Sequence, residues 1–155
     1  MRDDSPRLEF PDDAELIFIS DTHLDLNQLS WQHQLNSLAR LIARKKPAAL
    51  FILGDFIDGW IGPKHTSRQP LSQLKSILHQ ISNTCPIYFM PGNRDCLMHS
   101  NDCEQLSMQF IPDPTIIQYQ DRNIALTHGD LWCINDRSHL RFRKIAGHPF
   151  TAMLL

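Results

Sequence analysis

The chain has 155 residues, of which 42% are apolar and 21% charged, and this balance fits one globular domain with a sizeable core. A formal charge of −2 gives no basic footprint, so we expect no nucleic-acid partner. The longest apolar run covers only residues 48–53, and the polar start MRDDSPRLEFPDD does not look like a secretory signal. The four cysteines lack CxxC spacing and suit a reducing compartment, so we expect a cytoplasmic protein.

Short apolar runs alternate along the chain with segments of helical period. Residues 1–14 are expected to form a flexible segment. The expected strands are 16–19, 50–53, 87–90, 115–119 and 124–127, and the expected helices are 34–44, 71–81 and 103–110. A hairpin turn is expected at 121–123. Alternating strands and helices predict an α/β fold, with a mostly parallel central sheet and helices on its faces.

Residues capable of chemistry directly follow four of these strands. They are the segments Asp21-Thr22-His23, Gly54-Asp55, Gly92-Asn93-Arg94-Asp95 and His128. Ligands bind beyond the carboxyl ends of parallel strands, so we expect these side chains to gather at one edge of the sheet. Each segment alone has an ordinary structural interpretation. Together, however, the four segments follow one another at intervals of about one strand–helix unit. Mixed oxygen and nitrogen donors suit Mn, Fe or Zn better than Ca or Mg.

The ordered set resembles the calcineurin-like metallophosphoesterases, whose pattern is Asp-x-His, Gly-Asp-x-x-Asp, Gly-Asn-His-(Glu/Asp), His and a final Gly-His-x-His. Within this superfamily the chain is most similar to the branch that acts on UDP-2,3-diacylglucosamine in lipid A biosynthesis. Arg94 stands where most members carry a histidine, and the stretch LGDFIDGWIG at 53–62 is close to the Gly-Asp block of that branch. The resemblance runs from about Leu16 to Phe142 and implies a sandwich of two sheets with helices outside.

Two divalent metal ions, manganese in this branch, are the cofactors that the resemblance implies. Asp21 and His23 would hold the first ion, while Asn93 and His128 would hold the second. Asp55 would bridge the two ions.

The resemblance also implies a reaction, in which water attacks the diphosphate bond of a UDP-sugar lipid and releases UMP and 2,3-diacylglucosamine 1-phosphate. The implied catalytic residues are Asp55, Asn93, Arg94 and His128, and the implied substrate-binding residues are Asn93, Arg94 and Asp136. The protein would then work at the cytoplasmic face of the inner membrane as a peripheral protein. A basic stretch at 137–144 either contacts anionic lipid or is a solvated helix face.

The end of the chain departs from the family pattern. Residues 147–150 read Gly-His-Pro-Phe, with phenylalanine where the second histidine of Gly-His-x-His belongs, and the chain stops at Leu155. We therefore expect residues 1–155 to be one incomplete phosphoesterase domain, with the oligomeric state open. Two alternatives are a phosphoesterase with another substrate and an inactive remnant. Asp58 could orient a ligand histidine or cap its loop, and Asp95 could cap the next helix or support the site.

Overall fold

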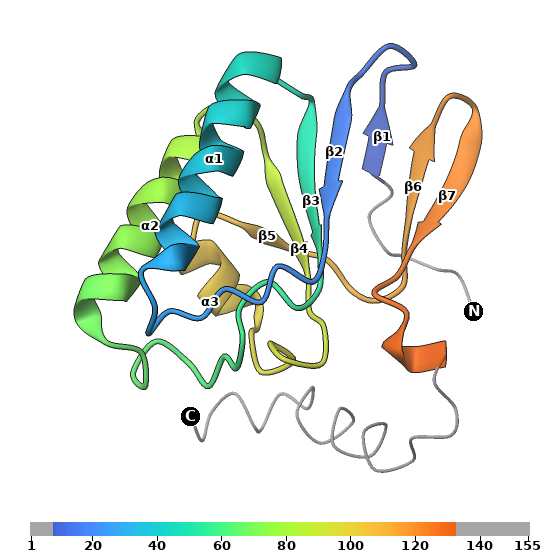
Figure 1. The fold of residues 1–155 in the computed structure, drawn as a ribbon. Coiled ribbons are helices and arrows are strands. Elements are labelled where there is room, and N and C mark those ends of the chain that lie inside the picture. The colour runs from blue at the N-terminus through green and yellow to red at the C-terminus, as the bar shows by residue number, and fades with distance from the viewer. Residues whose placement is uncertain (1–7, 133–155) are drawn as a thin grey trace.

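The computed structural model describes residues 8–132, which form two sheets lying face to face (Figure 1). The first sheet is parallel throughout and has the order β2-β3-β4-β5, with bounds Leu16–Ile19, Ala49–Leu53, Ile87–Met90 and Gln109–Phe110. The second sheet has the order β1-β6-β7, with bounds Leu8–Phe10, Thr115–Tyr119 and Arg122–Leu126. In it β1 runs parallel to β6, and β6 runs antiparallel to β7.

Two long helices cover the outer face of the first sheet (Figure 1). They are α1 (Ser30–Lys45) and α2 (Arg68–Ser82). A short helix, α3 (Ser100–Gln105), precedes β5, and a 3-10 turn at Asp130–Trp132 follows β7. Within residues 8–132, no helix combines the length and the apolar character needed to cross a bilayer.

Apolar side chains fill both faces of the first sheet. On β3, Leu50 and Ile52 pack with the helices, whereas Ala49 and Phe51 pack with the second sheet. Successive side chains of a strand point to opposite faces, so a strand buried on both sides is a continuous apolar run. This arrangement explains why the run at 48–53 is so uniformly apolar, and it leaves the polar residues for the loops that follow the strands.

The expected parallel sheet is confirmed, and the strands expected at 16–19, 87–90 and 115–119 have those bounds. The helix expected at 103–110 is wrong in its position. The helix ends at Gln105, Ser107 has a left-handed φ of 57°, and Gln109–Phe110 pair with β4 instead. The hairpin turn is formed by Gln120 and Asp121, which both adopt the positive φ of a tight hairpin, so residues 122 and 123 of the expected turn belong to β7, which covers Arg122–Leu126 rather than 124–127.

Part of the segment expected to be flexible forms a strand. Leu8–Phe10 form β1 and pair with Ile117–Tyr119 of β6, although residues 1–14 were expected to be flexible. Residues 1–7 lie outside the part that the structure describes. Because β1 and β6 are far apart in the chain, no local pattern in the sequence indicates this pairing.

Candidate metal centre

Asp55 lies at the centre of the predicted site. It is the second residue after β3, and its side chain is only 6% exposed. Its Oδ1 is 3.7 Å from Nε2 of His128, and its Oδ2 is 3.8 Å from Nε2 of His23. Each carboxylate oxygen therefore faces a different imidazole, an arrangement in which one carboxylate could bridge two cations.

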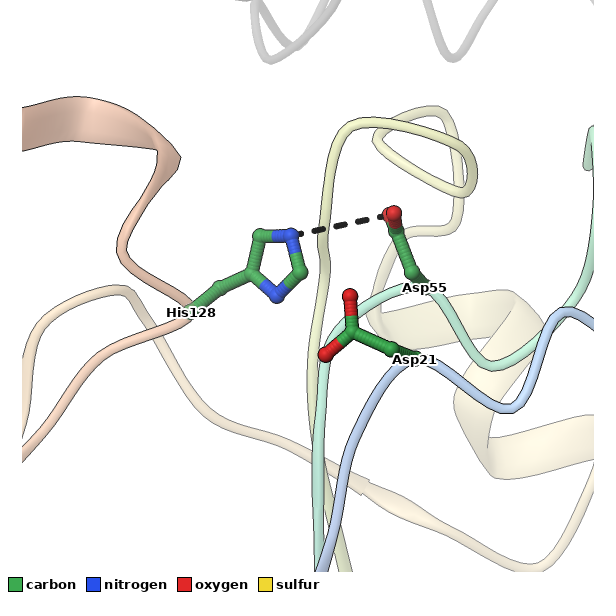
Figure 2. Close-up of side chains that lie close together, drawn as sticks. All are labelled: Asp21, Asp55 and His128. Atoms are coloured by element: carbon green, nitrogen blue, oxygen red, sulfur yellow. Dashed lines mark ion pairs between the residues drawn. The ribbon is translucent and has the colours of Figure 1, made fainter. Parts of the chain in front are cut away.

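Asp21 completes a cluster with Asp55 and His128. One ligand atom from each of the three lies within 4.8 Å of the others, a spacing that one metal ion could span. Figure 2 shows the three side chains converging on the same space. Asp21 follows β2 and Asp55 follows β3, whereas His128 follows β7 of the other sheet. The site therefore lies where the ends of the two layers meet.

The ring of His128 is oriented by the backbone. Its Nδ1 is 2.8 Å from the carbonyl oxygen of Leu53, the last residue of β3. A carbonyl only accepts hydrogen bonds, so Nδ1 carries the proton and donates it. In the neutral ring the lone pair is then on Nε2, the nitrogen that faces Asp55. A histidine that binds a metal ion usually has its other nitrogen held in this way.

The side-chain amide of Asn93 lies against the carboxylate of Asp55. Without a cation, the amide is satisfied only when its nitrogen faces Asp55 and donates to both carboxylate oxygens. With a cation between them, the amide oxygen could face the same carboxylate without repulsion. Asn93 is therefore placed to serve as a hydrogen-bond donor or as an oxygen ligand.

Three of the predicted ligands have a strained backbone. Asp21, His23 and Asp55 have φ values of 52°, 45° and 52°, in the left-handed region that residues with a side chain rarely adopt. The strain is held by hydrogen bonds from the N–H of Asp21 to the carbonyl of Gly54 (3.1 Å) and from the N–H of His23 to the carbonyl of Asp55 (2.9 Å). Such strain gathers at functional sites, where the surrounding structure must maintain it.

Two glycines allow these groups to approach one another. A Cβ added to Gly54 would collide with the ring of His128, and a Cβ added to Gly92 would collide with Asp55. Glycine at both positions is therefore required by close packing around the site, and at Gly54 also by a φ of 86°.

Asp95 joins the loops that follow β3 and β4. Its carboxyl group, on a residue that is 0% exposed, accepts hydrogen bonds from the N–H groups of Gly92 (2.7 Å), Phe56 (2.8 Å), and Asp55 and Ile57 (both 3.3 Å). Burial raises the pKa of Asp95 and the charge of Asp55 adds to this, while the hydrogen bonds from Gly92, Phe56 and Ile57 oppose it. The alternative that Asp95 caps the next helix is wrong, because α3 has His99 as its N-cap residue.

Arg94 lies beside Asp55 but is oriented by another acid. Its backbone N–H donates to Oδ1 of Asp55 at 2.8 Å. Its Nε is 3.2 Å from Oδ1 of Asp58, so the carboxylate of Asp58 contacts Arg94 rather than a histidine of the site. The sequence contains no spacing signal for this pair, because the two residues come from loops after different strands.

The structure brings the five predicted metal ligands to one place. Asp21, His23, Asn93 and His128 all surround Asp55, and Arg94 lies next to them. Their roles as ligands and catalytic residues remain predictions. Other predicted groups lie outside the described residues, namely Asp136, the basic stretch at 137–144 and the Gly-His-Pro-Phe segment.

Comparison with known families agrees with this geometry. The model of the calcineurin-like phosphoesterases matches residues 15–150, so the chain belongs to the calcineurin-like phosphoesterase family. Members of this family use metal ions, and the cluster around Asp55 is the candidate site for them. The expected α/β metallophosphoesterase fold is thereby confirmed.

Individual relatives carry a more specific name. The UDP-2,3-diacylglucosamine hydrolase of Neisseria gonorrhoeae is 33% identical over 128 residues, which are 83% of this chain and 53% of the relative. The protein of the same name from Edwardsiella ictaluri is 37% identical over 142 residues, 89% of this chain and 53% of the relative. The chain thus spans about half the length of the curated relatives it matches.

A solved structure shows the same fold at lower identity. The crystal structure of Pseudomonas putida nuclease MPE superimposes with a TM-score of 0.50 and 19% identity, covering 64% of this chain and 48% of that chain.

Proposed function

We propose that this chain provides the two-metal centre of a phosphoesterase that hydrolyses the diphosphate bond of UDP-2,3-diacylglucosamine to UMP and 2,3-diacylglucosamine 1-phosphate. The observation that carries the proposal is the position of Asp55, whose two oxygens face the imidazoles of His23 and His128. The proposed substrate is supported by the hydrolases of that name, which are 33% and 37% identical to this chain.

The donor set fits two manganese ions. Asp21 and His23 would hold one ion, Asn93 and His128 the other, and Asp55 both. Carboxylate, imidazole and amide donors suit Mn²⁺ and related metals better than an all-oxygen cation such as Ca²⁺. The chemistry that two such ions would supply there is stabilisation of the charge that develops during an in-line displacement at phosphorus, together with a lowered pKa for a water molecule.

The charges of the protein explain why cations are needed for substrate binding. Among the described residues, the loops around the site bring the carboxyl groups of Asp21, Asp55 and Asp95 together with the guanidinium of Arg94, which is paired with Asp58. These acids alone would repel a diphosphate, because like charges in a partly desolvated site interact strongly. Bound cations would turn this repulsion of the diphosphate into attraction.

Arg94 and Asn93 would then bind the substrate directly. A guanidinium is planar and can donate two parallel hydrogen bonds to phosphate oxygens, which a neutral histidine cannot. The amide of Asn93 lies close enough to Asp55 to contact both a cation and a phosphate oxygen. We propose Asp136 as a further substrate contact, on the basis of its match to the family pattern alone.

The substrate class also leads us to propose a location. A diacylated sugar nucleotide lies in a membrane surface, so the protein would contact the cytoplasmic face of the inner membrane as a peripheral protein. The cations of the stretch at 137–144 would contribute about 1 kcal/mol each to binding anionic lipid when close to the surface.

Release of UMP from UDP-2,3-diacylglucosamine in the presence of Mn²⁺ tests the proposal. The chain should release UMP, Asp55→Asn should reduce the rate to background, and Asp121→Asn should leave it unchanged. Asp121 is an exposed residue of the β6–β7 turn, so its substitution removes the same charge far from the site. Hydrolysis of phosphomonoesters but not of this lipid would contradict the proposed substrate. Absence of metal-dependent hydrolysis of any phosphoester would contradict the proposed activity.

A further inference from the structure

We propose that Asp58 is a positioning residue, which holds the guanidinium of Arg94 ready to bind the phosphate groups of the substrate; this inference rests on the proposed function. The contact joins Nε of Arg94 to Oδ1 of Asp58 at 3.2 Å. Among the described residues, no second ion-pair partner of Arg94 is found.

The pair has little importance for folding. The side chains of Arg94 and Asp58 are 56% and 40% exposed, and ion pairs this accessible to water contribute little to stability. The backbone of Arg94 is held without it, since its N–H donates to Oδ1 of Asp55 (2.8 Å) and its carbonyl accepts from the N–H of Trp60 (3.2 Å). Asp58 therefore affects the side chain of Arg94 and not its backbone.

Asp58 is itself held in register with the metal site. Its backbone N–H donates to the carbonyl of Leu24 at 3.1 Å, and the adjacent Ile57 forms a β-bridge with Leu24. Asp58 also belongs to the loop that carries Asp55. The position of Asp58 is thus fixed relative to the residues that would hold the cations. The guanidinium of Arg94, which Asp58 contacts, is therefore positioned relative to the same residues.

The choice of nitrogen matters for the chemistry. Contact through Nε leaves the two terminal nitrogens of the guanidinium to form a bidentate contact with phosphate oxygens. An exposed arginine otherwise samples many rotamers and must lose this freedom when the substrate binds. A carboxylate that already restricts the side chain reduces this loss, and so strengthens binding and the stabilisation of developing charge.

A double-mutant cycle tests the proposal. UMP release from UDP-2,3-diacylglucosamine and hydrolysis of bis(p-nitrophenyl) phosphate are measured for the parent chain, Asp58→Ala, Arg94→Ala and the double variant, together with Mn²⁺ affinity. We expect kcat/KM to fall about 10-fold in Asp58→Ala and about 100-fold in Arg94→Ala. The double variant should equal Arg94→Ala, because Asp58 acts only through that side chain. Mn²⁺ affinity should not change in Asp58→Ala.

A conservative variant and a matched pair serve as controls. Asp58→Asn keeps an oxygen that can accept from Nε, so it should recover most of the activity that Asp58→Ala loses. Glu15 pairs with Lys45 at 3.1 Å, with side chains 49% and 48% exposed, at the opposite end of β2 from the site. Glu15→Ala should therefore leave the kinetics unchanged.

The outcomes separate this inference from the proposed function. UMP release with additive effects of the two substitutions, or with reduced Mn²⁺ affinity in Asp58→Ala, would overturn the positioning role and leave the proposed function standing. Non-additive effects on bis(p-nitrophenyl) phosphate without UMP release would support the positioning role and contradict the proposed substrate. Absence of hydrolysis of both compounds by the parent chain would overturn both.

Discussion

The Nδ1 atom of His128 lies 2.8 Å from the carbonyl oxygen of Leu53. His128 follows β7 of the second sheet and Leu53 ends β3 of the first, so this hydrogen bond joins the two sheets. This contact directs Nε2 toward Asp55 and joins the two layers at the site. The position of the imidazole therefore depends on the packing of both sheets.

Replacing His128 by asparagine should weaken Mn²⁺ binding at least 10-fold, because a ligand nitrogen and its backbone anchor are both lost. Isothermal titration calorimetry of the purified chain measures this. His33→Asn is the matched control, since His33 is exposed on α1. Equal Mn²⁺ affinity in the two variants would contradict the role of His128.

Gly54→Ala should be more destabilising than Gly59→Ala. Both glycines have positive φ, 86° and 83°, so both substitutions carry a left-handed strain of about 1–2 kcal/mol. A Cβ meets the His128 ring at Gly54 and nothing within 4 Å at Gly59. The collision should add about 1–3 kcal/mol for Gly54→Ala, measured by urea unfolding. Equal free energies of unfolding would show that His128 is not packed against Gly54.

Asp95→Ala should reduce the free energy of unfolding by about 3 kcal/mol or more, because buried N–H groups would lose their acceptor. Asp12→Ala, at an exposed position before β2, should change it by less than about 0.5 kcal/mol. Chemical denaturation of both variants provides the comparison. A small effect of Asp95→Ala would mean that the loops after β3 and β4 are held together without its carboxyl group.

Cys103 should resist alkylation in the folded protein. Burial raises the pKa of its thiol to about 12, and the charges of Asp102, Asp95 and Glu104 add to this. At pH 8.5 the thiolate is then outnumbered roughly 3,000-fold by the thiol, and only the thiolate reacts. Because an unperturbed thiol titrates near 9.0, this group also favours the folded state below pH 9 and loses that contribution as the pH rises toward 12.

Iodoacetamide treatment at pH 8.5 with peptide mapping checks this expectation. Cys103 should be modified in urea but not in the native protein. Comparable rates of modification in the two conditions would contradict the burial of Cys103 in the core.

Much of the fold could be predicted because the two faces of the first sheet are buried. Runs such as Ala49–Leu53 and Ile87–Met90 are apolar for that reason, and their ends are marked by the polar residues that follow. The pairing of β1 with β6 could not be predicted, because it joins segments more than 100 residues apart through backbone hydrogen bonds. β5 has only two residues, too few to show the alternation of apolar and polar side chains that indicates a strand.

The candidate ligands were predictable for a similar reason, since carboxyl ends of parallel strands meet at one edge. The groups that hold these ligands were not. The carbonyl of Leu53 has no sequence signature, and an aspartate that accepts backbone hydrogen bonds, such as Asp95, looks the same in sequence as one that caps a helix. The pairing of Asp58 with Arg94 likewise arises only from the folded positions of two loops.

The central claim is that Asp55 lies in a site for divalent cations, and thermal unfolding with and without Mn²⁺ tests it most directly. At about 100 times its dissociation constant, Mn²⁺ should stabilise the folded chain by about 2.7 kcal/mol and raise the Tm by roughly 5–10 °C. This rise should disappear in Asp55→Asn and persist in Asp121→Asn. A parent chain with no rise in Tm, or a rise of equal size in Asp55→Asn, would contradict the claim.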